Sequence, residues 1–179
     1  MKDLNNHHPA FVNLQTNAAV VDPVLQELQR DSRASAAELA ELLNRDAPDL
    51  EARIKEWESN GTILGYQAVI DPDRAGTTSV AAVIEVKLTP EREGGFDRIA
   101  RRISKFDQVS SCYLMSGGYD LMVLVEDETL REVARFVAEK LSSLDGVIST
   151  STHFQLKVYK QSGFNTQRQE EDSRLAVSP

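Results

Sequence analysis

The sequence predicts an α+β protein in which a bundle of short helices precedes a β-α-β-β-α-β unit. Three observations across the 179 residues support this prediction. Helix-capping residues stand immediately before apolar stretches that repeat at the spacing of an α-helix. Other stretches alternate apolar and polar residues, as strands do. Gly, Pro and Asn residues separate the two kinds of stretch, so one helical part and one mixed part are expected.

Three short helices are predicted within residues 22–61. Each begins with residues that favour a helix N-terminus: Asp22-Pro23, Ser35-Ala-Ala-Glu38 and Asp46. The third helix ends at Asn60-Gly61, and its apolar side chains recur at i, i+4 and i+7: Leu50, Ile54 and Trp57. Three short helices joined by tight turns are typical of a helix-turn-helix (winged-helix-like) domain.

Residues 77–160 alternate between strand and helix patterns. In chain order, the predicted elements are 80–88, 96–106, 109–115, 121–125, 129–141 and 148–158. The second and fifth of these have helical spacing, and the capping box Thr129-Leu-Arg-Glu132 begins the fifth. The order β-α-β-β-α-β is that of a ferredoxin-like domain, whose four antiparallel strands carry both helices on one face. The other face needs a cover, and a second copy of the domain is the simplest one.

The remaining segments flank or connect these domains. Residues 1–21 lack periodicity and predict a flexible arm, and 161–179 are polar and unpatterned, as expected of a disordered tail. Residues 62–76 contain an extended apolar stretch and are predicted to form a linker strand. The predicted order is therefore an arm, a helix-turn-helix domain (22–61), the linker strand, a ferredoxin-like domain (77–160) and the tail.

Composition and motifs exclude several classes of protein. No apolar run approaches about 18 residues, so no membrane-spanning helix is expected, and the first residues lack the apolar stretch of a secretory signal. The single cysteine, Cys112, suits a reducing cytoplasm. His153 is the only histidine outside the arm, which leaves no two-histidine metal site on a folded element. Because no catalytic triad, phosphate loop or dinucleotide fingerprint occurs, we expect neither an enzyme nor a cofactor.

Three segments, in this order, resemble the Lrp/AsnC family of transcription regulators. They are LQRDSRASAAELA (28–40), RIKEWESNGTILGY (53–66) and SGGYDL (116–121). The resemblance covers residues 22–160 and implies a cytoplasmic regulator whose helix-turn-helix enters the DNA major groove. It also implies that the C-terminal domains pair into homodimers through their sheets, that dimers assemble into larger rings, and that an amino acid or related small molecule binds where those domains meet.

The resemblance further implies where DNA and the effector bind. The expected DNA-binding residues lie on or beside the third helix: Arg33, Arg45, Pro48, Asp49, Glu51, Ala52, Arg53 and Lys55. The expected effector-binding residues lie in the Gly-rich turn and the last strand: Ser116, Gly117, Gly118, Tyr119, Asp120, Thr150 and Thr152. The Asp120 carboxylate or the N–H groups of the turn would hold the charged groups of an amino acid. Taken without the family, the backbone of a hairpin turn is the favoured explanation of Gly and Asp here.

The third helix is acidic for a helix that binds DNA. The chain has a net charge of -8, and residues 22–60 hold ten acidic and five basic residues. Since DNA affinity depends on cationic contacts to phosphate, each domain is expected to bind weakly and to rely on multivalency within an oligomer. Two alternatives stay open. One is a family member that has lost DNA binding and acts as a small-molecule sensor or as an assembly partner of paralogues. The other, less favoured, is a family-related enzyme such as a tetrapyrrole decarboxylase.

Overall fold

The computed structural model describes residues 21–90 and 95–166 of the chain. The chain divides into two compact units, Met1–Val69 and Ile70–Pro179. The division falls inside the 62–76 segment that was predicted to link two domains. No helix in the described ranges is long and apolar enough to cross a membrane.

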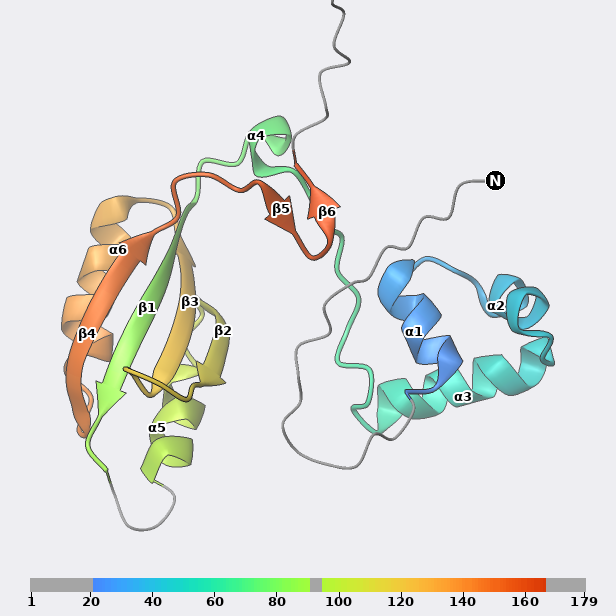
Figure 1. The fold of residues 1–179 in the computed structure, drawn as a ribbon, viewed down its shortest axis with the longest axis horizontal. Helices are drawn as coiled ribbons and strands as arrows, with labels where there is room; N and C mark the ends of the chain where they lie inside the picture. Colours follow the sequence, from blue (N-terminus) through green and yellow to red (C-terminus); the bar gives the residue numbers. More distant parts are fainter. Residues whose placement is uncertain (1–20, 91–94, 167–179) are drawn as a thin grey trace, which may run out of the picture. The chain divides into compact units, whose positions relative to one another are not determined.

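The first unit contains three helices, α1 (Pro23–Arg30), α2 (Ala36–Leu43) and α3 (Ala47–Ser59) (Figure 1). The predicted N-caps Asp22, Ser35 and Asp46 each accept a backbone N–H bond with their side chains. The capping box is complete, because Glu38 Oε2 accepts the Ser35 N–H at 2.8 Å. These side chains satisfy donors that a helix leaves unpaired in its first turn, which explains why each helix begins where the sequence predicted.

A small apolar core lies between the three helices. Its buried members are Val24, Leu28, Leu39, Ala40, Leu50 and Trp57. On α3, Leu50 and Trp57 are 2% and 7% exposed, and Ile54 packs beside them, as the helical spacing predicted. The burial of these three side chains leaves the opposite face of α3 to solvent.

Residues 62–76 do not form the predicted linker strand. Their backbone is irregular up to Asp71, which caps the single helical turn α4 (Pro72–Ala75). Ile63 packs against the helical core, but most other apolar side chains of this segment are exposed, with Leu64 95% exposed and Ile70 56% exposed. A strand forms only where a neighbour completes its hydrogen-bond ladder, and no other described segment of this chain lies beside 62–76 as a paired strand. The apolar pattern predicted an extended backbone, but a strand also needs a neighbouring strand to pair with, which the pattern does not predict.

The second unit contains a four-stranded antiparallel sheet in the order β2-β3-β1-β4 (Figure 1). The strands are β1 (Val80–Leu88), β2 (Val109–Leu114), β3 (Leu121–Asp127) and β4 (Val147–Phe154). The helices are α5 (Gly95–Ile103) and α6 (Leu130–Phe136), and α6 continues into one π-helical turn, η1 (Val137–Leu141). This β-α-β-β-α-β order and its strand arrangement confirm the predicted ferredoxin-like domain.

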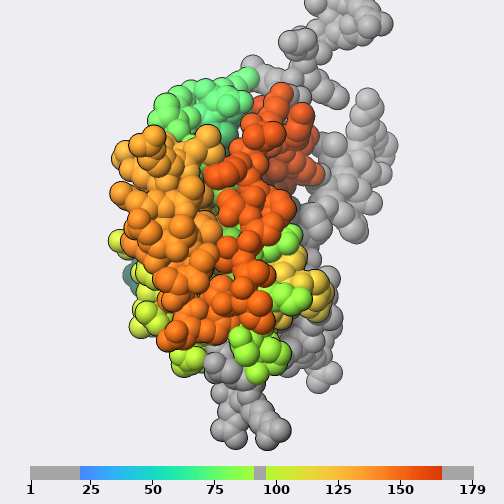
Figure 2. All heavy atoms as spheres, turned by 90° about the vertical axis from the view of Figure 1, so that its left-hand side faces the viewer, coloured from blue at the N-terminus to red at the C-terminus, as the bar shows by residue number. Residues whose placement is uncertain are grey.

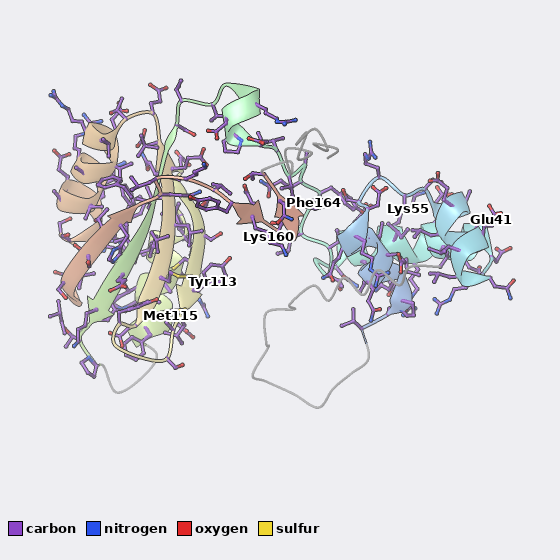
Figure 3. All side chains as sticks on the ribbon, turned by 45° about the horizontal axis from the view of Figure 1, so that its top comes forward. Glu41, Lys55, Tyr113, Met115, Lys160 and Phe164 are labelled. Carbon is purple, nitrogen blue, oxygen red and sulfur yellow. The ribbon has the colours of Figure 1, made fainter. Side chains whose placement is uncertain are left out.

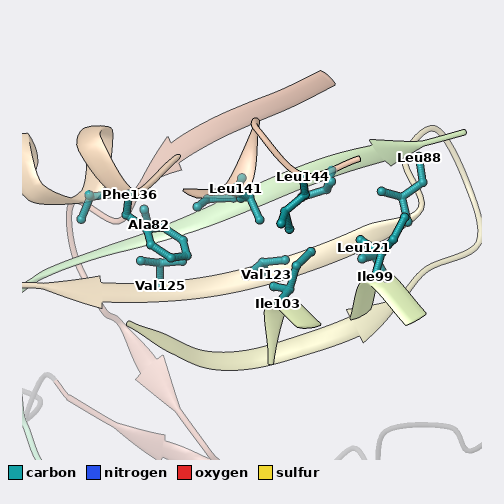
Figure 4. Packing of buried hydrophobic residues seen from close by; sticks show 13 residues of the cluster. Ala82, Leu88, Ile99, Ile103, Leu121, Val123, Val125, Phe136, Leu141 and Leu144 are labelled. Atoms are coloured by element: carbon teal, nitrogen blue, oxygen red, sulfur yellow. The ribbon is translucent and has the colours of Figure 1, made fainter. Parts of the chain in front are cut away.

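Alternate residues of the two central strands form the core with the helices (Figure 4). Ile84 and Val86 of β1 and Val123 of β3 are fully buried. They pack against side chains from both helices, including Ile103 and Phe136. Because α5 and α6 contribute to one cluster, both helices cover the same face of the sheet, and the alternate residues of each strand lie on the other face.

The chain after β4 departs from the prediction in two ways. Strand β4 ends at Phe154 instead of 158, because β1 begins at Val80 and the last cross-strand bond joins the Gln155 N–H to the Ala81 carbonyl at 2.9 Å. The predicted disordered tail is wrong over its first residues. A hairpin forms there from β5 (Lys160–Gln161) and β6 (Phe164–Asn165).

The sequence Ser162-Gly163 explains this hairpin. Both residues have a positive φ, 46° and 91°, as a tight two-residue hairpin turn requires.

Figure 2 views the second unit from the side of β4 and α6, whose atoms make up most of that face. The expected arm, except for Val21, and the tail from 167 onward lie outside the described residues.

Candidate functional site

Five cationic side chains occur in the described part of the helical unit, and each forms an ion pair with a carboxylate of that unit. The pairs are Arg30–Glu27 (3.0 Å), Arg33–Asp31 (3.6 Å), Arg45–Asp22 (3.6 Å), Arg53–Asp22 (3.7 Å) and Lys55–Glu51 (2.7 Å). Exposed ion pairs of this kind contribute little to stability, so a DNA phosphate can compete with the carboxylates for these cations.

The residues expected to read DNA lie on the exposed side of α3. Pro48, Asp49, Glu51, Ala52, Arg53 and Lys55 are all exposed. Figure 3 labels Lys55 on α3 and Glu41 on α2, both of which are exposed. The hydrogen bond between Lys55 and Glu51 is the largest cause that raises the pKa of Lys55 and lowers the pKa of Glu51. Both groups are therefore charged at neutral pH, and the charge of Lys55 is partly neutralised by Glu51 on the same helix.

Asp22 lies at the centre of a cluster that sequence reasoning missed. Its Oδ1 caps α1 by accepting the Val24 N–H at 3.0 Å. The same carboxylate pairs with Arg45 and with Arg53, and the Arg53 guanidinium lies 5.0 Å from the centre of the Trp57 ring. Two of the predicted DNA-binding arginines are thus held at the α1 N-terminus. The sequence identified Asp22 as a cap, but nothing in its neighbourhood along the chain indicated these contacts.

The Gly-rich turn that joins β2 to β3 is exposed. Ser116, Gly117 and Gly118 are exposed, and Tyr119 and Asp120 are half-buried. Gly117 has a φ of +144°, a backbone conformation that other residues rarely adopt, and a Cβ there would meet nothing within 4 Å. The turn therefore presents its backbone to solvent, where a small molecule or another chain can approach it closely.

Asp120 holds this turn against the end of β1. Its Oδ2 accepts the Leu88 N–H at 2.7 Å, and its own N–H donates to the Val86 carbonyl at 3.0 Å. Its carbonyl accepts the Met115 N–H at 2.8 Å, which closes the turn. The Leu88 bond lies where the β1–β4 register shifts, between Lys87 and Leu88. One carboxylate oxygen of the expected effector contact is therefore already used in the protein's own structure.

Thr150 and Thr152 lie apart from the turn, in β4. They pair with Val86 and Ile84 of β1, on the helix-covered face of the sheet. Val86 pairs on its other side with Leu121, the residue after Asp120. Two strand spacings, about 10 Å, therefore separate the backbones of Thr150 and Leu121. The Thr150 hydroxyl lies 3.1 Å from the Ser142 hydroxyl at the end of η1. Within one chain, the structure does not bring the two groups of expected effector residues into contact.

The other face of the sheet carries half-buried apolar residues and one polar cluster. Val83 of β1 and Leu124 of β3 pair directly and are half-buried. On the same face, His153 Nε2 lies 3.4 Å from a Glu85 carboxylate oxygen and 3.3 Å from the Ser151 hydroxyl. This face thus combines an apolar centre with hydrogen-bonding groups at the β4 edge, the composition of a surface that another protein can cover.

The described residues contain neither a cluster of metal ligands nor an activated thiol. No three His, Cys, Asp or Glu side chains there gather closely enough to hold a metal ion. Cys112 of β2 is half-buried, and burial raises the pKa of its thiol, with a smaller opposing effect from a hydrogen bond to Ser104. A neutral, partly buried thiol is a poor nucleophile.

A helix-turn-helix unit followed by a ferredoxin-like unit with an exposed Gly-rich turn is the architecture of a ligand-responsive transcription regulator. Comparison with known proteins identifies the family. Residues 81–163 match the profile of the Lrp/AsnC ligand binding domain. An uncharacterised HTH-type transcriptional regulator of Bacillus subtilis, YugG, is 42% identical over 87% of this chain and 95% of its own length. The chain belongs to the Lrp/AsnC family of transcriptional regulators.

Two more relatives extend this comparison. A proline dehydrogenase transcriptional activator of Rhizobium radiobacter is 30% identical over 78% of this chain and 89% of its own length. The crystal structure of a transcriptional regulator from Neisseria meningitidis, solved in complex with L-methionine, superposes with a TM-score of 0.60. It is 25% identical and covers 77% of this chain and 88% of the other.

Proposed function

We propose that this regulator binds paired DNA half-sites through α3 and changes its occupancy when an amino acid or related small molecule binds its ferredoxin-like unit. The observation that carries this proposal is the likeness to an HTH-type regulator along almost the whole chain, so that the DNA-binding and ligand-binding units occur together. Because its proposed target is DNA, the proposed location is the cytoplasm. Its relatives are transcriptional regulators, so regulation, not catalysis, is its proposed role.

The DNA contacts would come from the exposed side of α3 and the arginines beside it. To contribute, Lys55 must exchange Glu51 for phosphate, and Arg45 and Arg53 must exchange Asp22. A DNA phosphate carries as much negative charge as a carboxylate, and the cation of each competing pair is exposed, so the exchange costs little. We therefore propose low affinity for each unit, with tight binding only when an oligomer engages two half-sites.

The effector would bind at the exposed turn 116–118. Free backbone N–H groups suit a carboxylate, and the second oxygen of Asp120 suits an ammonium group. The methionine complex of the Neisseria regulator supports an amino acid as the ligand class. Because Thr150 and Thr152 lie about two strands from the turn, we propose that they complete the site only where a second protomer supplies one of the two groups of residues.

The proposed dimer forms through the uncovered sheet face. Val83 and Leu124 would lie at its centre, with Glu85 and His153 toward the β4 edge. Two sheets that pack face to face bury such half-exposed apolar residues in a layer about 10 Å thick. Higher oligomers would then assemble from these dimers and bring effector sites of neighbouring dimers together.

A DNA-binding selection with the purified full-length protein tests the proposal. Random duplexes are selected at low and at moderate salt, with and without a panel of amino acids. Enrichment of a palindromic site whose occupancy changes with one amino acid is the expected result. If oligomeric protein enriches no sequence at any salt, the regulator has lost DNA binding, an alternative favoured by the pairing of all five described cations of the helical unit with carboxylates.

A further inference from the structure

Glu51 and Lys55 form an ion pair on the exposed side of α3. The Lys55 ammonium donates a hydrogen bond to Glu51 Oε1 at 2.7 Å, and the two side chains are 61% and 69% exposed. The opposite side of the helix packs into the core of the unit through Leu50, Ile54 and Trp57. The backbone of the pair is therefore held by a packed helix, while its charged ends lie in solvent and can exchange partners.

The two members of the pair suit different parts of a DNA duplex. In a helix-turn-helix, the residues near the N-terminus of the second helix contact base edges. Glu51 lies in the second turn of α3 (Ala47–Ser59), and Lys55 lies one turn further on. Once Lys55 moves to a phosphate, as proposed above, Glu51 loses the partner of its charge. A carboxylate that leaves water without a partner is costly, so Glu51 then needs a hydrogen-bond donor in the groove.

The major groove offers a carboxylate few suitable donors. Only the N4 amino group of cytosine and the N6 amino group of adenine donate there, whereas guanine and thymine present acceptors. On adenine, the N6 donor lies beside the N7 acceptor, which repels a negative charge. Cytosine has no acceptor beside its amino group in this groove. A carboxylate therefore favours cytosine over the other three bases.

We propose that Glu51 selects a cytosine in each DNA half-site, and that this contact forms as Lys55 passes from Glu51 to a phosphate. The inference rests on the proposed DNA-binding function and adds to it the base that one residue reads. A site without cytosine at this position leaves the carboxylate desolvated and without a donor. The acidic character of α3 would then reduce binding to other sequences and so contribute to specificity.

A selection of randomised duplexes with the full-length protein tests this inference. The base preference at each position is compared among the wild type, Glu51→Gln, Glu51→Ala and the control Glu41→Gln. Glu41 lies on α2 and is exposed (Figure 3), so the control removes the same charge from the same unit. Circular dichroism and thermal unfolding check that each variant is folded.

The wild type and the control should both select a cytosine at one position of each half-site. Glu51→Gln should select adenine there instead, because a glutamine amide pairs with adenine N6 and N7. Glu51→Ala should accept all four bases at that position. In titrations of the wild type with defined duplexes, placing adenine where the cytosine stood should weaken binding about tenfold.

Three results would overturn the inference. If all base preferences of the wild type persist in Glu51→Gln, the carboxylate reads no base, and the DNA-binding function stays intact. If the position that changes holds a base other than cytosine, or changes equally in Glu41→Gln, Glu51 does not select cytosine. If folded, oligomeric wild type enriches no sequence at any salt concentration, both the inference and the DNA-binding function on which it rests are removed.

Discussion

Replacing Asp120 separates its two expected roles, in the fold and in effector binding. Asp120→Ala removes the acceptor of the Leu88 N–H, a bond of 2.7 Å at a residue that is 2% exposed. A hydrogen bond to a charged group contributes about 1.5–3 kcal/mol, and a buried donor left unpaired costs about as much. We therefore expect a loss of about 1–3 kcal/mol, which lowers the melting temperature of a unit of this size by about 5–15 °C. Asp120→Asn retains an oxygen acceptor and should lose less than about 1 kcal/mol.

The effector assay uses the same pair of variants. If the second carboxylate oxygen holds the ammonium group of an amino acid, the Asn variant folds normally but loses the thermal shift that the ligand produces in the wild type. If Asp120 only positions the turn, the Asn variant keeps that shift. Stability is measured by chemical denaturation and the ligand effect by calorimetry with the amino-acid panel. An Asp120→Ala protein within about 0.5 kcal/mol of the wild type would refute the structural argument, because a buried N–H without an acceptor cannot be cost-free.

Three further predictions concern other parts of the chain. Asp22→Asn keeps an N-cap of equal quality but weakens the pairing with Arg45 and Arg53. DNA affinity should therefore rise several-fold with little change in stability. A filter-binding titration that shows weaker DNA binding contradicts this prediction. Ser35→Ala removes the cap of α2 and should cost about 1 kcal/mol in urea unfolding. The hydrogen bonds from Ser35 lower the pKa of its partner Glu38. Their stabilisation is therefore present above the ordinary pKa of 4.5 and is lost as pH falls through the lowered value. A Ser35→Ala penalty that stays constant through this acid range argues against this pH dependence. The raised pKa of Cys112 predicts that iodoacetamide at pH 8 modifies the native protein more slowly than the unfolded one, and equal rates count against that shift.

The features that the sequence predicted are those with local signals. The N-caps Asp22, Ser35 and Asp46 lie within three residues of the donors they satisfy, so the helix starts could be placed from the sequence. The alternation along β1 likewise gave the correct buried face. The partner of each N-cap is a near neighbour along the chain, and the alternation of a strand shows which side is apolar without needing its partners.

The features that were missed depend on residues far apart in sequence. The acceptor of the Leu88 N–H lies 32 positions away, at Asp120. The Asp22 carboxylate meets Arg45 and Arg53 only after three helices have packed. A single sequence gives no register for such contacts. The sequence therefore nominated candidate site residues, but it could not predict that the Asp120 carboxylate is bound within the fold. Nor could it predict that Thr150 and Thr152 lie on the far side of β1 from the turn.

If each unit contacts DNA weakly, as proposed, oligomerisation is the step at which an effector has most influence. For one unit with a Kd of about 10⁻⁵ M and an effective concentration of about 10⁻³ M at the second half-site, two linked units reach about 10⁻⁷ M. Separating the units then costs about a hundredfold in affinity, without any change at the DNA contacts. An effector that alters the pairing of ferredoxin-like units would therefore change occupancy by up to this factor. Sedimentation and DNA titration of the same samples test this: the effector should change assembly and DNA affinity at the same concentration. If DNA affinity changes while the oligomer does not, the effector acts on the geometry of the paired helices instead.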